Sequence, residues 1–325
     1  MRKLTLDELC LRLQTAKDPV ILIHKNPDGD CVGSAAALAH YFLGRGEAVS
    51  IRCADPIPVR LAHLTAGLRL TPYAGREGRT VLAVDVASPQ QLGTLEGEFS
   101  GDGAPDFMID HHEKGTPFAD HYVVGEAAAA GEILFTVFRH MEQKGSSPLT
   151  LPVAEALFAS ISSDTGCFRF SNCTPATHMA AAHLLSLGID GGLINHALYE
   201  SKTMAEIAAE GFVASHMQTA ANGRIAYAAI SNADMAEGGF ERQDLDTAVD
   251  IVRSLAGVAV AFVLKEAPQK NTWRVSLRSV GADVASVAAH FGGGGHKMAA
   301  GCTLADTPVD GAISSVLEQI LSLSV

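Results

Sequence analysis

The chain has 325 residues, of which 47% are hydrophobic and 18% are charged, and its formal net charge is −12. This length suits two domains better than one, and the acidic balance argues against a protein that grips long nucleic acid through a basic face. No apolar run reaches the roughly 18 residues that span a bilayer, and residues 1–18 lack the apolar core of a signal peptide. We therefore expect a cytoplasmic protein with no membrane partner.

The six cysteines form no C-x-x-C pair, so we expect free thiols that are mostly buried.

In the first half of the chain, short apolar runs alternate with helical patterns. Val20–Ile23, Val81–Val84 and Phe107–Ile109 are predicted to be buried strands, and Val49–Arg52 an edge strand. The amphipathic stretch Val32–Leu43 predicts a helix, and further helices are expected at about 127–143, 152–163, 175–187 and 203–218. This alternation predicts an α/β domain with a doubly wound, mainly parallel sheet that is covered on both faces.

The second half changes character. Its predicted strands are Arg224–Ile230, Ala259–Lys265, Trp273–Ser279 and Ala299–Leu304, and its predicted helices are Leu245–Leu255, Asp283–His290 and Val309–Leu323, with FGGGGH at 291–296 as a loop. Strands and helices in this order predict a smaller α/β domain with a mixed sheet. We expect a catalytic domain at 1–188, a helical linker at 189–215 and a second domain at 216–325.

Acidic and histidine residues follow each of the three buried strands. The first strand leads into His24, Asp28 and Asp30, the second into Asp85, and the third into residues 110–112, Asp-His-His. In parallel sheets ligands bind at the carboxyl ends of the strands, and neighbouring strands lie about 4.8 Å apart, so these groups can converge. Converging carboxylates repel one another unless a cation lies among them. On spacing alone, a set of unrelated caps and turns explains the same residues equally well.

The number and type of these groups bear on the metal. They are too many for one tetrahedral zinc site and suit two divalent ions about 3.5–4 Å apart with a bridging carboxylate. Oxygen and imidazole ligands without a thiolate favour Mn²⁺. Pro27 and Gly29 predict a tight turn that presents Asp28 and Asp30, and the helix that follows directs its positive N-terminal dipole toward the same place. Gly33 would let this helix approach the strand closely.

These motifs, in this order, resemble the DHH phosphoesterase family. The resemblance is carried by His24-x-x-Pro-Asp-Gly-Asp30, by Asp85 and by Asp110-His111-His112. Residues 163–170, SDTGCFRF, are similar to the family's fourth motif, and residues 291–301, FGGGGHKMAAG, to the glycine-rich motif of its DHH-associated C-terminal domain. The resemblance extends over nearly the whole chain.

The resemblance implies a role for each matching residue. One divalent metal would be held by His24, Asp28 and Asp85, and the other by Asp30, Asp85, His111 and Asp164, with Asp85 as the bridge. His112 would lie at the attacked phosphate as a catalytic residue together with Asp85, and Asp110 would be a buried orienting group. Asp164 follows a predicted helix and not a strand, so only the resemblance points to it.

The resemblance also assigns substrate contacts to the C-terminal domain, across a cleft from the metals. Arg278, Gly293, Gly294, Gly295 and His296 would bind phosphate. Without the resemblance, a flexible loop is the simpler interpretation of the glycine run.

Within the family, the chain is similar to enzymes that hydrolyse very short RNA and remove the 3′-phosphate of 3′-phosphoadenosine 5′-phosphate. The expected partners are therefore short RNA oligonucleotides and small phosphorylated nucleotides, and a homodimer is left open. A phosphodiesterase for linear dinucleotides such as pApA would carry the same motifs. A nucleotide-binding module without catalysis is a further alternative, although none of the expected metal ligands is missing.

Overall fold

The computed structural model describes residues 1–112, 115–146 and 148–323. The chain forms two compact units, Met1–Ser201 (unit 1) and Lys202–Val325 (unit 2). The segment 189–215, expected as a helical linker, contributes a helix to each unit. Helix α7 (Gly191–Tyr199) packs on α5 (Leu151–Asp164) in unit 1, and α8 (Met204–His216) packs on α10 (Ala248–Arg253) in unit 2. Within the described residues, no helix combines the length and the apolar character needed to cross a membrane.

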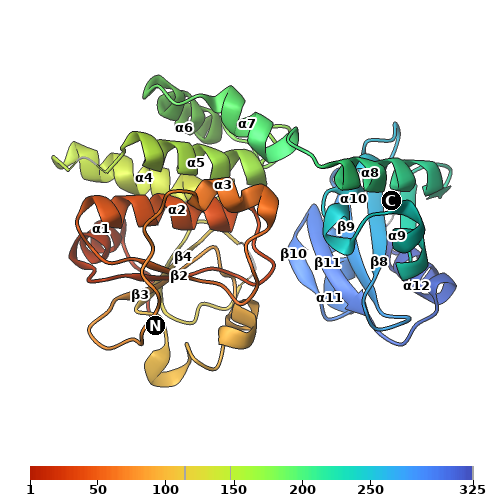
Figure 1. Ribbon diagram of the computed structural model, residues 1–325, viewed down its shortest axis with the longest axis horizontal. Helices are drawn as coiled ribbons and strands as arrows, with labels where there is room; N and C mark the ends of the chain where they lie inside the picture. The colour runs from red at the N-terminus through yellow and green to blue at the C-terminus, as the bar shows by residue number, and fades with distance from the viewer. Residues whose placement is uncertain (113–114, 147, 324–325) are drawn as a thin grey trace. The chain divides into compact units, whose positions relative to one another are not determined.

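Unit 1 is built on a parallel sheet (Figure 1). The sheet has five strands in the order β2-β1-β3-β4-β5. Its strands are β1 Val20–Leu22, β2 Ser50–Arg52, β3 Val81–Val84, β4 Phe107–Asp110 and β5 Asp120–Val123. Its helices are α1 Leu6–Thr15, α2 Gly29–Gly44, α3 Ala62–Thr65, α4 Ala130–Gln143, α5 Leu151–Asp164, α6 Pro175–Ser186 and α7 Gly191–Tyr199. Because all the strands are parallel, their carboxyl ends lie along one edge of the sheet, as predicted.

Both faces of this sheet are covered. Alternate residues of β3 point to opposite sides: Leu82 and Val84 pack with the helical layer, and Val81 and Ala83 with a second cluster. Helices α2, α4 and α5 lie on the first side of the strands (Figure 1). The second side is closed by a short 3₁₀ helix, Pro89–Leu95, and the residues after it rather than by long helices.

Helices α2 and α5 pack unusually closely, and Gly33 is the reason. We expected Gly33 to let α2 approach a strand, but the element that comes close to it is helix α5. A Cβ on Gly33 would lie 2.9 Å from the Ala156 carbonyl oxygen and 2.9 Å from the Ser160 backbone nitrogen, both on α5. The close packing brings the Ser160 side chain to Asp30, where its hydroxyl donates a 2.5 Å hydrogen bond. The glycine therefore serves the candidate site through the distance between the two helices.

The substitution Gly33→Ala is expected to lower the free energy of unfolding by about 1–3 kcal/mol, because the added methyl group must push α2 away from the α5 backbone. The control is Gly44→Ala at the end of the same helix, where a Cβ meets nothing within 4 Å. That change should be neutral or stabilising by up to about 1 kcal/mol through helix propensity. Urea unfolding measures both, and equal stabilities of the two variants would contradict the packing argument.

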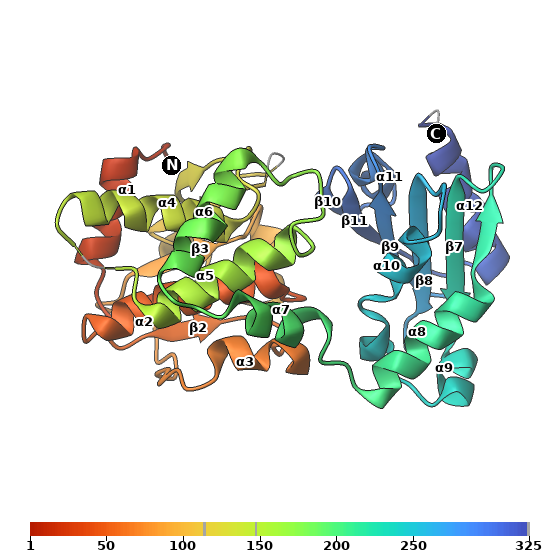
Figure 2. The same ribbon diagram turned by 90° about the horizontal axis from the view of Figure 1, so that it is seen from above.

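Unit 2 contains a mixed six-stranded sheet in the order β10-β11-β9-β8-β7-β6 (Figure 2), in which only β7 and β8 are parallel. The strands are β6 Gln218–Ala220, β7 Ile225–Ile230, β8 Val260–Glu266, β9 Trp273–Ser279, β10 Gly294–His296 and β11 Ala299–Leu304. The helices are α8 Met204–His216, α9 Asn232–Gly238, α10 Ala248–Arg253, α11 Val284–His290 and α12 Val309–Leu321. One face packs on α11 and α12 and the other on α8, α9 and α10, which confirms the predicted mixed-sheet domain.

Residues 291–296 were expected as a loop, and for the second half of this segment the expectation was wrong. Gly294–His296 form β10, which pairs antiparallel with Ala299–Gly301 of β11. A Cβ on Gly293 would lie 2.2 Å from the Gly301 carbonyl oxygen, and Gly295 has a φ of +139° that disfavours other residues. Close approach between two strands is therefore sufficient reason for at least two of these glycines.

Candidate active site

His24 and Asp28 lie just beyond β1. The imidazole Nδ1 of His24 is 2.8 Å from the Lys25 carbonyl oxygen, which assigns a proton to Nδ1 and leaves Nε2 as the nitrogen that faces the carboxylates. This Nε2 lies 3.7 Å from Asp28 Oδ1 and 3.6 Å from Asp85 Oδ2. Asp28 is also the N-cap of α2, because its Oδ1 accepts hydrogen bonds from the backbone of Asp30 and Cys31.

Asp30 is held firmly in the first turn of α2. Its Oδ1 accepts hydrogen bonds from the hydroxyls of Ser34 at 3.1 Å and Ser160 at 2.5 Å. Its Oδ2 accepts the Ala130 backbone N–H at 2.8 Å, at the N-terminus of α4. The same Oδ2 lies 3.4 Å from His111 Nε2. The carboxylate is thus pre-oriented, and one oxygen remains directed toward the histidine.

Asp85 occupies the centre of the cluster. It follows β3 directly, has a left-handed φ of +57° and is only 2% exposed. Its Oδ2 faces His24, whereas its Oδ1 lies 3.4 Å from His111 Nε2. Oδ1 is buried and has no hydrogen-bond partner among the described residues, which is costly for a carboxylate oxygen. One carboxylate therefore presents one oxygen to each of two groups of ligands.

His111 and Asp164 complete the second group. His111 Nδ1 is 3.1 Å from the Ala127 carbonyl oxygen, so the proton is on Nδ1 and Nε2 faces the carboxylates. Nε2 lies 3.7 Å from Asp164 Oδ2. Asp164 is the last residue of α5, so a helix end brings this carboxylate to the edge where the strands end.

His112 pairs with Asp110 beside this cluster. Its Nδ1 lies 2.7 Å from Asp110 Oδ1 and 3.6 Å from Asp85 Oδ1. Asp110 is 2% exposed, so its carboxylate is committed to holding the imidazole. The pairing places the proton on Nδ1.

The electrostatics show how crowded the cluster is. Burial, with the Asp85 carboxylate adding to it, raises the pKa of Asp30 well above its usual range. Burial also raises the pKa of Asp164 to about 6 despite the attraction of His111, and Asp28 and Asp85 add to this effect. Burial would raise the pKa of Asp85 as well, but the neighbouring imidazoles of His111 and His24 hold it well below its usual range.

These residues fit a divalent cation. Ligand atoms of Asp30, Asp85 and His111 lie within 4.8 Å of one another, and so do those of His24, Asp28, Cys31 and Asp85. Carboxylate oxygens and imidazole nitrogens with fixed tautomers are ordinary ligands for such ions, and a cation would satisfy the orphaned Asp85 oxygen. The structure thus brings together all six metal ligands expected from the sequence.

Adding Mn²⁺ at 100 times its dissociation constant is expected to stabilise the protein by about 2.7 kcal/mol. At a fixed Mn²⁺ concentration the gain should grow as the pH rises through about 6, because the ion then no longer has to displace a proton from Asp164. Without metal, its raised pKa stabilises the fold at low pH, and this contribution is lost between pH 3.8 and about 6. Thermal unfolding with Mn²⁺ and with chelator, over a pH series, measures the effect. A metal gain that did not depend on pH would contradict it.

The expected substrate-binding residues lie together within unit 2. His296 of β10 pairs with Ala299 of β11, which pairs with Arg278 of β9, so the three residues form one row across the sheet. Arg278 Nε lies 3.9 Å from Asp250 Oδ1 on α10, and its side chain is 27% exposed. The row therefore places a guanidinium group and an imidazole two strands apart.

Reasoning from the sequence missed several supporting groups. Ser34 and Ser160 fix Asp30, and the carbonyl of Ala127 fixes the His111 tautomer, yet none of them stands out in the sequence. The spacing of Ser34, one helical turn after Asp30, was the one signal that could have been used. The thiol of Cys31 was also not expected among the ligand atoms.

Known protein families match the two units of the chain separately. Residues 19–161 match the model of the DHH family N-terminal domain, and residues 222–323 match that of the DHHA1 domain. A crystal structure of an exopolyphosphatase-related protein from Bacteroides fragilis superposes with a TM-score of 0.86 at 22% identity, over 98% of this chain and 97% of that chain. RecJ from Thermus thermophilus shares the fold at a TM-score of 0.56 and 13% identity, over 98% of this chain and 55% of its own.

Two curated relatives match over nearly their full length. The bifunctional oligoribonuclease and PAP phosphatase NrnA of Thermus thermophilus is 28% identical over 95% of this chain and 91% of its own. The protein of the same name from Bacillus subtilis is 26% identical over 90% of this chain and 92% of its own. Because the two domain models match in order and together account for well over half of the chain, the protein belongs to the DHH family, with a DHHA1 domain as its second unit.

Proposed function

We propose that this protein is a phosphoesterase that hydrolyses very short RNA to mononucleotides and converts 3′-phosphoadenosine 5′-phosphate to AMP. The observation that carries the proposal is Asp85, whose two oxygens face two separate groups of metal-type ligands. The two relatives named as bifunctional oligoribonuclease and PAP phosphatase support the choice of substrates. The net charge of −12 also suits short substrates better than long polymers.

In this proposal the chain holds two divalent ions, and Mn²⁺ suits most of the ligand atoms. His24, Asp28 and Asp85 form one half-site, and Asp30, Asp85, His111 and Asp164 form the other. When bound, such ions supply Lewis-acid chemistry, since they polarise a phosphate oxygen and make water a stronger nucleophile near neutral pH.

His112 contributes a donor to the reacting phosphate. Asp110 keeps the imidazole oriented, and Nε2 donates to phosphate oxygens as negative charge develops when the ring is protonated. Burial opposes that protonation, but the hydrogen bond to Asp110 and the charge of Asp85 raise the pKa of His112 above its usual value. Both effects increase the share of the imidazolium form relative to a free imidazole.

Unit 2 contributes substrate binding through Arg278, Gly293, Gly294, Gly295 and His296. The row of Arg278, Ala299 and His296 supports this role, because it places two hydrogen-bond donors two strands apart in one sheet. The predicted cytoplasmic location and the homodimer remain predictions.

The substitution Arg278→Ala is expected to raise the KM for a five-nucleotide RNA by about tenfold or more, since a charged hydrogen bond to phosphate contributes about 1.5–3 kcal/mol. Hydrolysis of a minimal phosphodiester should change little. The matched control is Arg274→Ala on the same strand, where the side chain is exposed. Unchanged KM values for the RNA in the Arg278 variant would remove this residue from the site.

Side-by-side turnover of a dinucleotide, a five-nucleotide RNA and 3′-phosphoadenosine 5′-phosphate tests the function. The proposal predicts Mn²⁺-dependent hydrolysis of all three and complete loss with chelator. Activity on the dinucleotide alone would replace it with a linear dinucleotide phosphodiesterase. Binding of nucleotides without turnover of any substrate would favour a non-catalytic nucleotide-binding module.

A further inference from the structure

The half-site that contains His24 has a fourth potential ligand that the proposed roles do not use. Cys31 Sγ belongs to the group in which ligand atoms of His24, Asp28, Cys31 and Asp85 all lie within 4.8 Å of one another. The group formed by Asp30, Asp85 and His111 contains no sulfur. The two half-sites therefore differ in the chemical softness of their ligands.

The first turn of α2 puts the thiol in this position. Asp28 caps the helix, and the Cys31 backbone N–H donates to its carboxylate at 3.1 Å. The hydrogen bond that caps the helix therefore also brings Cys31 close to Asp28, because the N-cap residue and the third residue after it lie on the same side of the first turn. Cys31 is fully buried, so its thiol is shielded from solvent on the side of the helix core.

A purely structural role for this thiol is the competing explanation. Buried cysteines often act as small apolar fillers, and Cys31 Sγ lies 3.5 Å from the Asp28 carbonyl oxygen, a suitable acceptor for a thiol. A cysteine that only fills space, however, does not need carboxylate and imidazole groups beside its thiol. Here the thiol lies among ligand atoms that are all within 4.8 Å of one another. The neighbouring Asp85 is 2% exposed, its Oδ2 lies 3.6 Å from His24 Nε2, and that nitrogen is directed inward by the bond at Nδ1.

We propose that Cys31 Sγ is the fourth ligand of the half-site formed by His24, Asp28 and Asp85. On metal binding the S–H bond breaks, the proton leaves to solvent, and a sulfur–metal bond forms. One nitrogen, two carboxylate oxygens and one thiolate make a four-ligand set that selects Zn²⁺ or Co²⁺ over Mn²⁺. The other half-site keeps oxygen and imidazole ligands and its preference for Mn²⁺. This inference rests on the proposed metal-binding function and refines it to a mixed-metal centre.

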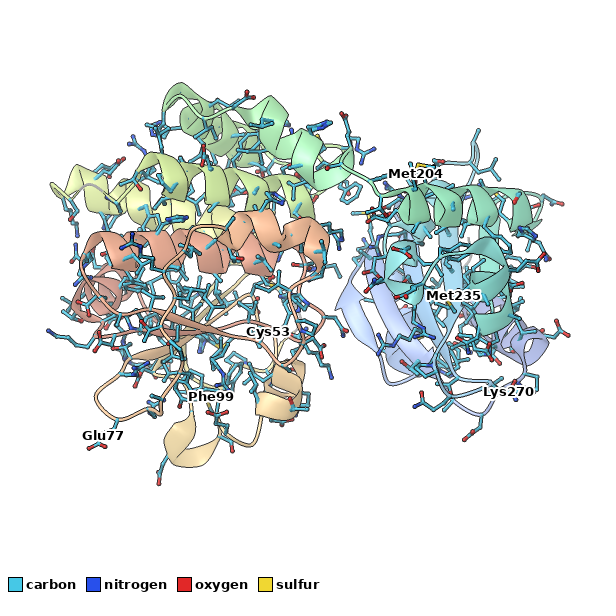
Figure 3. The ribbon with its side chains drawn as sticks, viewed as in Figure 1. Cys53, Glu77, Phe99, Met204, Met235 and Lys270 are labelled. Atoms are coloured by element: carbon cyan, nitrogen blue, oxygen red, sulfur yellow. The ribbon has the colours of Figure 1, made fainter. Side chains whose placement is uncertain are left out.

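The chain offers a matched control in Cys53, which is labelled in Figure 3. Cys53 directly follows β2, and its Sγ donates to the His24 carbonyl oxygen at 3.2 Å. It is thus close to the same histidine but does not belong to the group of ligand atoms. Oxidation or general disturbance of the region would affect a Cys53→Ser variant as much as a Cys31→Ser variant.

The test is titration of the metal-free full chain with Co²⁺, followed by optical absorption, for the wild type, Cys31→Ser and Cys53→Ser. The wild type and Cys53→Ser are expected to show a sulfur-to-cobalt charge-transfer band in the near ultraviolet, and Cys31→Ser to lack it. Competition with Zn²⁺ should show an affinity at least about tenfold lower in Cys31→Ser, with Mn²⁺ binding nearly unchanged.

X-ray absorption at the zinc edge of the wild type needs no variant and covers the case in which Cys31→Ser does not fold. A sulfur neighbour at about 2.3 Å is expected. Cobalt and zinc binding without any sulfur signal would overturn the assignment of Cys31 and leave the proposed metal site intact. Failure of the wild type to bind any of the three cations would overturn both.

Discussion

Asp85→Asn is expected to abolish turnover, with kcat lowered by at least about a thousandfold. In the proposed site this carboxylate serves both half-sites, with Oδ2 toward His24 and Oδ1 toward His111. An amide offers a neutral oxygen on one side and an N–H donor on the other, so neither half-site keeps its ligand set. Bound metal ions contribute several kcal/mol to such a reaction, and about 1.4 kcal/mol corresponds to each tenfold in rate. Calorimetric titration with Mn²⁺ should show the loss of binding in parallel.

The asparagine variant separates this role from folding. Residue 85 has a φ of +57°, a conformation that asparagine adopts readily and alanine does not, so Asp85→Asn should fold normally by circular dichroism. The control is Asp120→Asn on the edge strand β5. This change removes the ion pair of Asp120 with Arg12 and should leave kcat unchanged. Wild-type turnover by the Asp85 variant would exclude a bridging carboxylate at this position.

The sheet of unit 1 was predictable because its three central strands are buried on both faces. Such strands form continuous apolar runs, and β1, β3 and β4 all stand out in the sequence for this reason. Their carboxyl ends then lead directly to His24, Asp85 and His111. By contrast β5, with the sequence DHYV, is half-buried at the edge of the sheet and carries polar residues. Its pairing with β4 depends on tertiary contacts that no local pattern records.

The parts of the site that escaped residue-by-residue reasoning are those that depend on helix packing. Asp164 lies at the end of α5, so the strand-end argument could not find it and only the family motif did. Helix α5, which carries it, lies against α2 at Gly33. The thiol of Cys31 was interpreted as an ordinary buried group, because one cysteine in an alanine-rich helix carries no signal until the fold places it among ligand atoms.

The glycine run shows the opposite difficulty. A stretch of four glycines indicates backbone freedom but does not say what approaches the backbone. In the structure the partner of Gly293 is the neighbouring strand at Gly301. A phosphate contact therefore has to be argued from Arg278 and His296, whose side chains can donate, more than from the glycines.

His112→Gln is expected to lower kcat by about 10²–10³, the usual cost of removing one donor to a developing oxyanion. Unlike Asp85→Asn, it should leave Mn²⁺ binding essentially unchanged, because in the proposal His112 lies beside the metal ligands without being one. Steady-state kinetics together with calorimetric titration would show this split between lost turnover and retained metal affinity. Loss of Mn²⁺ affinity in the glutamine variant would make His112 a metal ligand and contradict the role of phosphate donor.

Asp110→Asn provides a graded comparison for the same pair. The asparagine still reaches the imidazole, but it can direct an N–H instead of an oxygen at Nδ1, which lies 2.7 Å from the present carboxylate. Loss of such an orienting partner costs about 10–100-fold, so the Asp110 variant should fall between the wild type and His112→Gln. In the double variant, Asp110→Asn should add little to His112→Gln, because the carboxylate then has no imidazole to orient. Fully additive losses would instead show that Asp110 and His112 act independently.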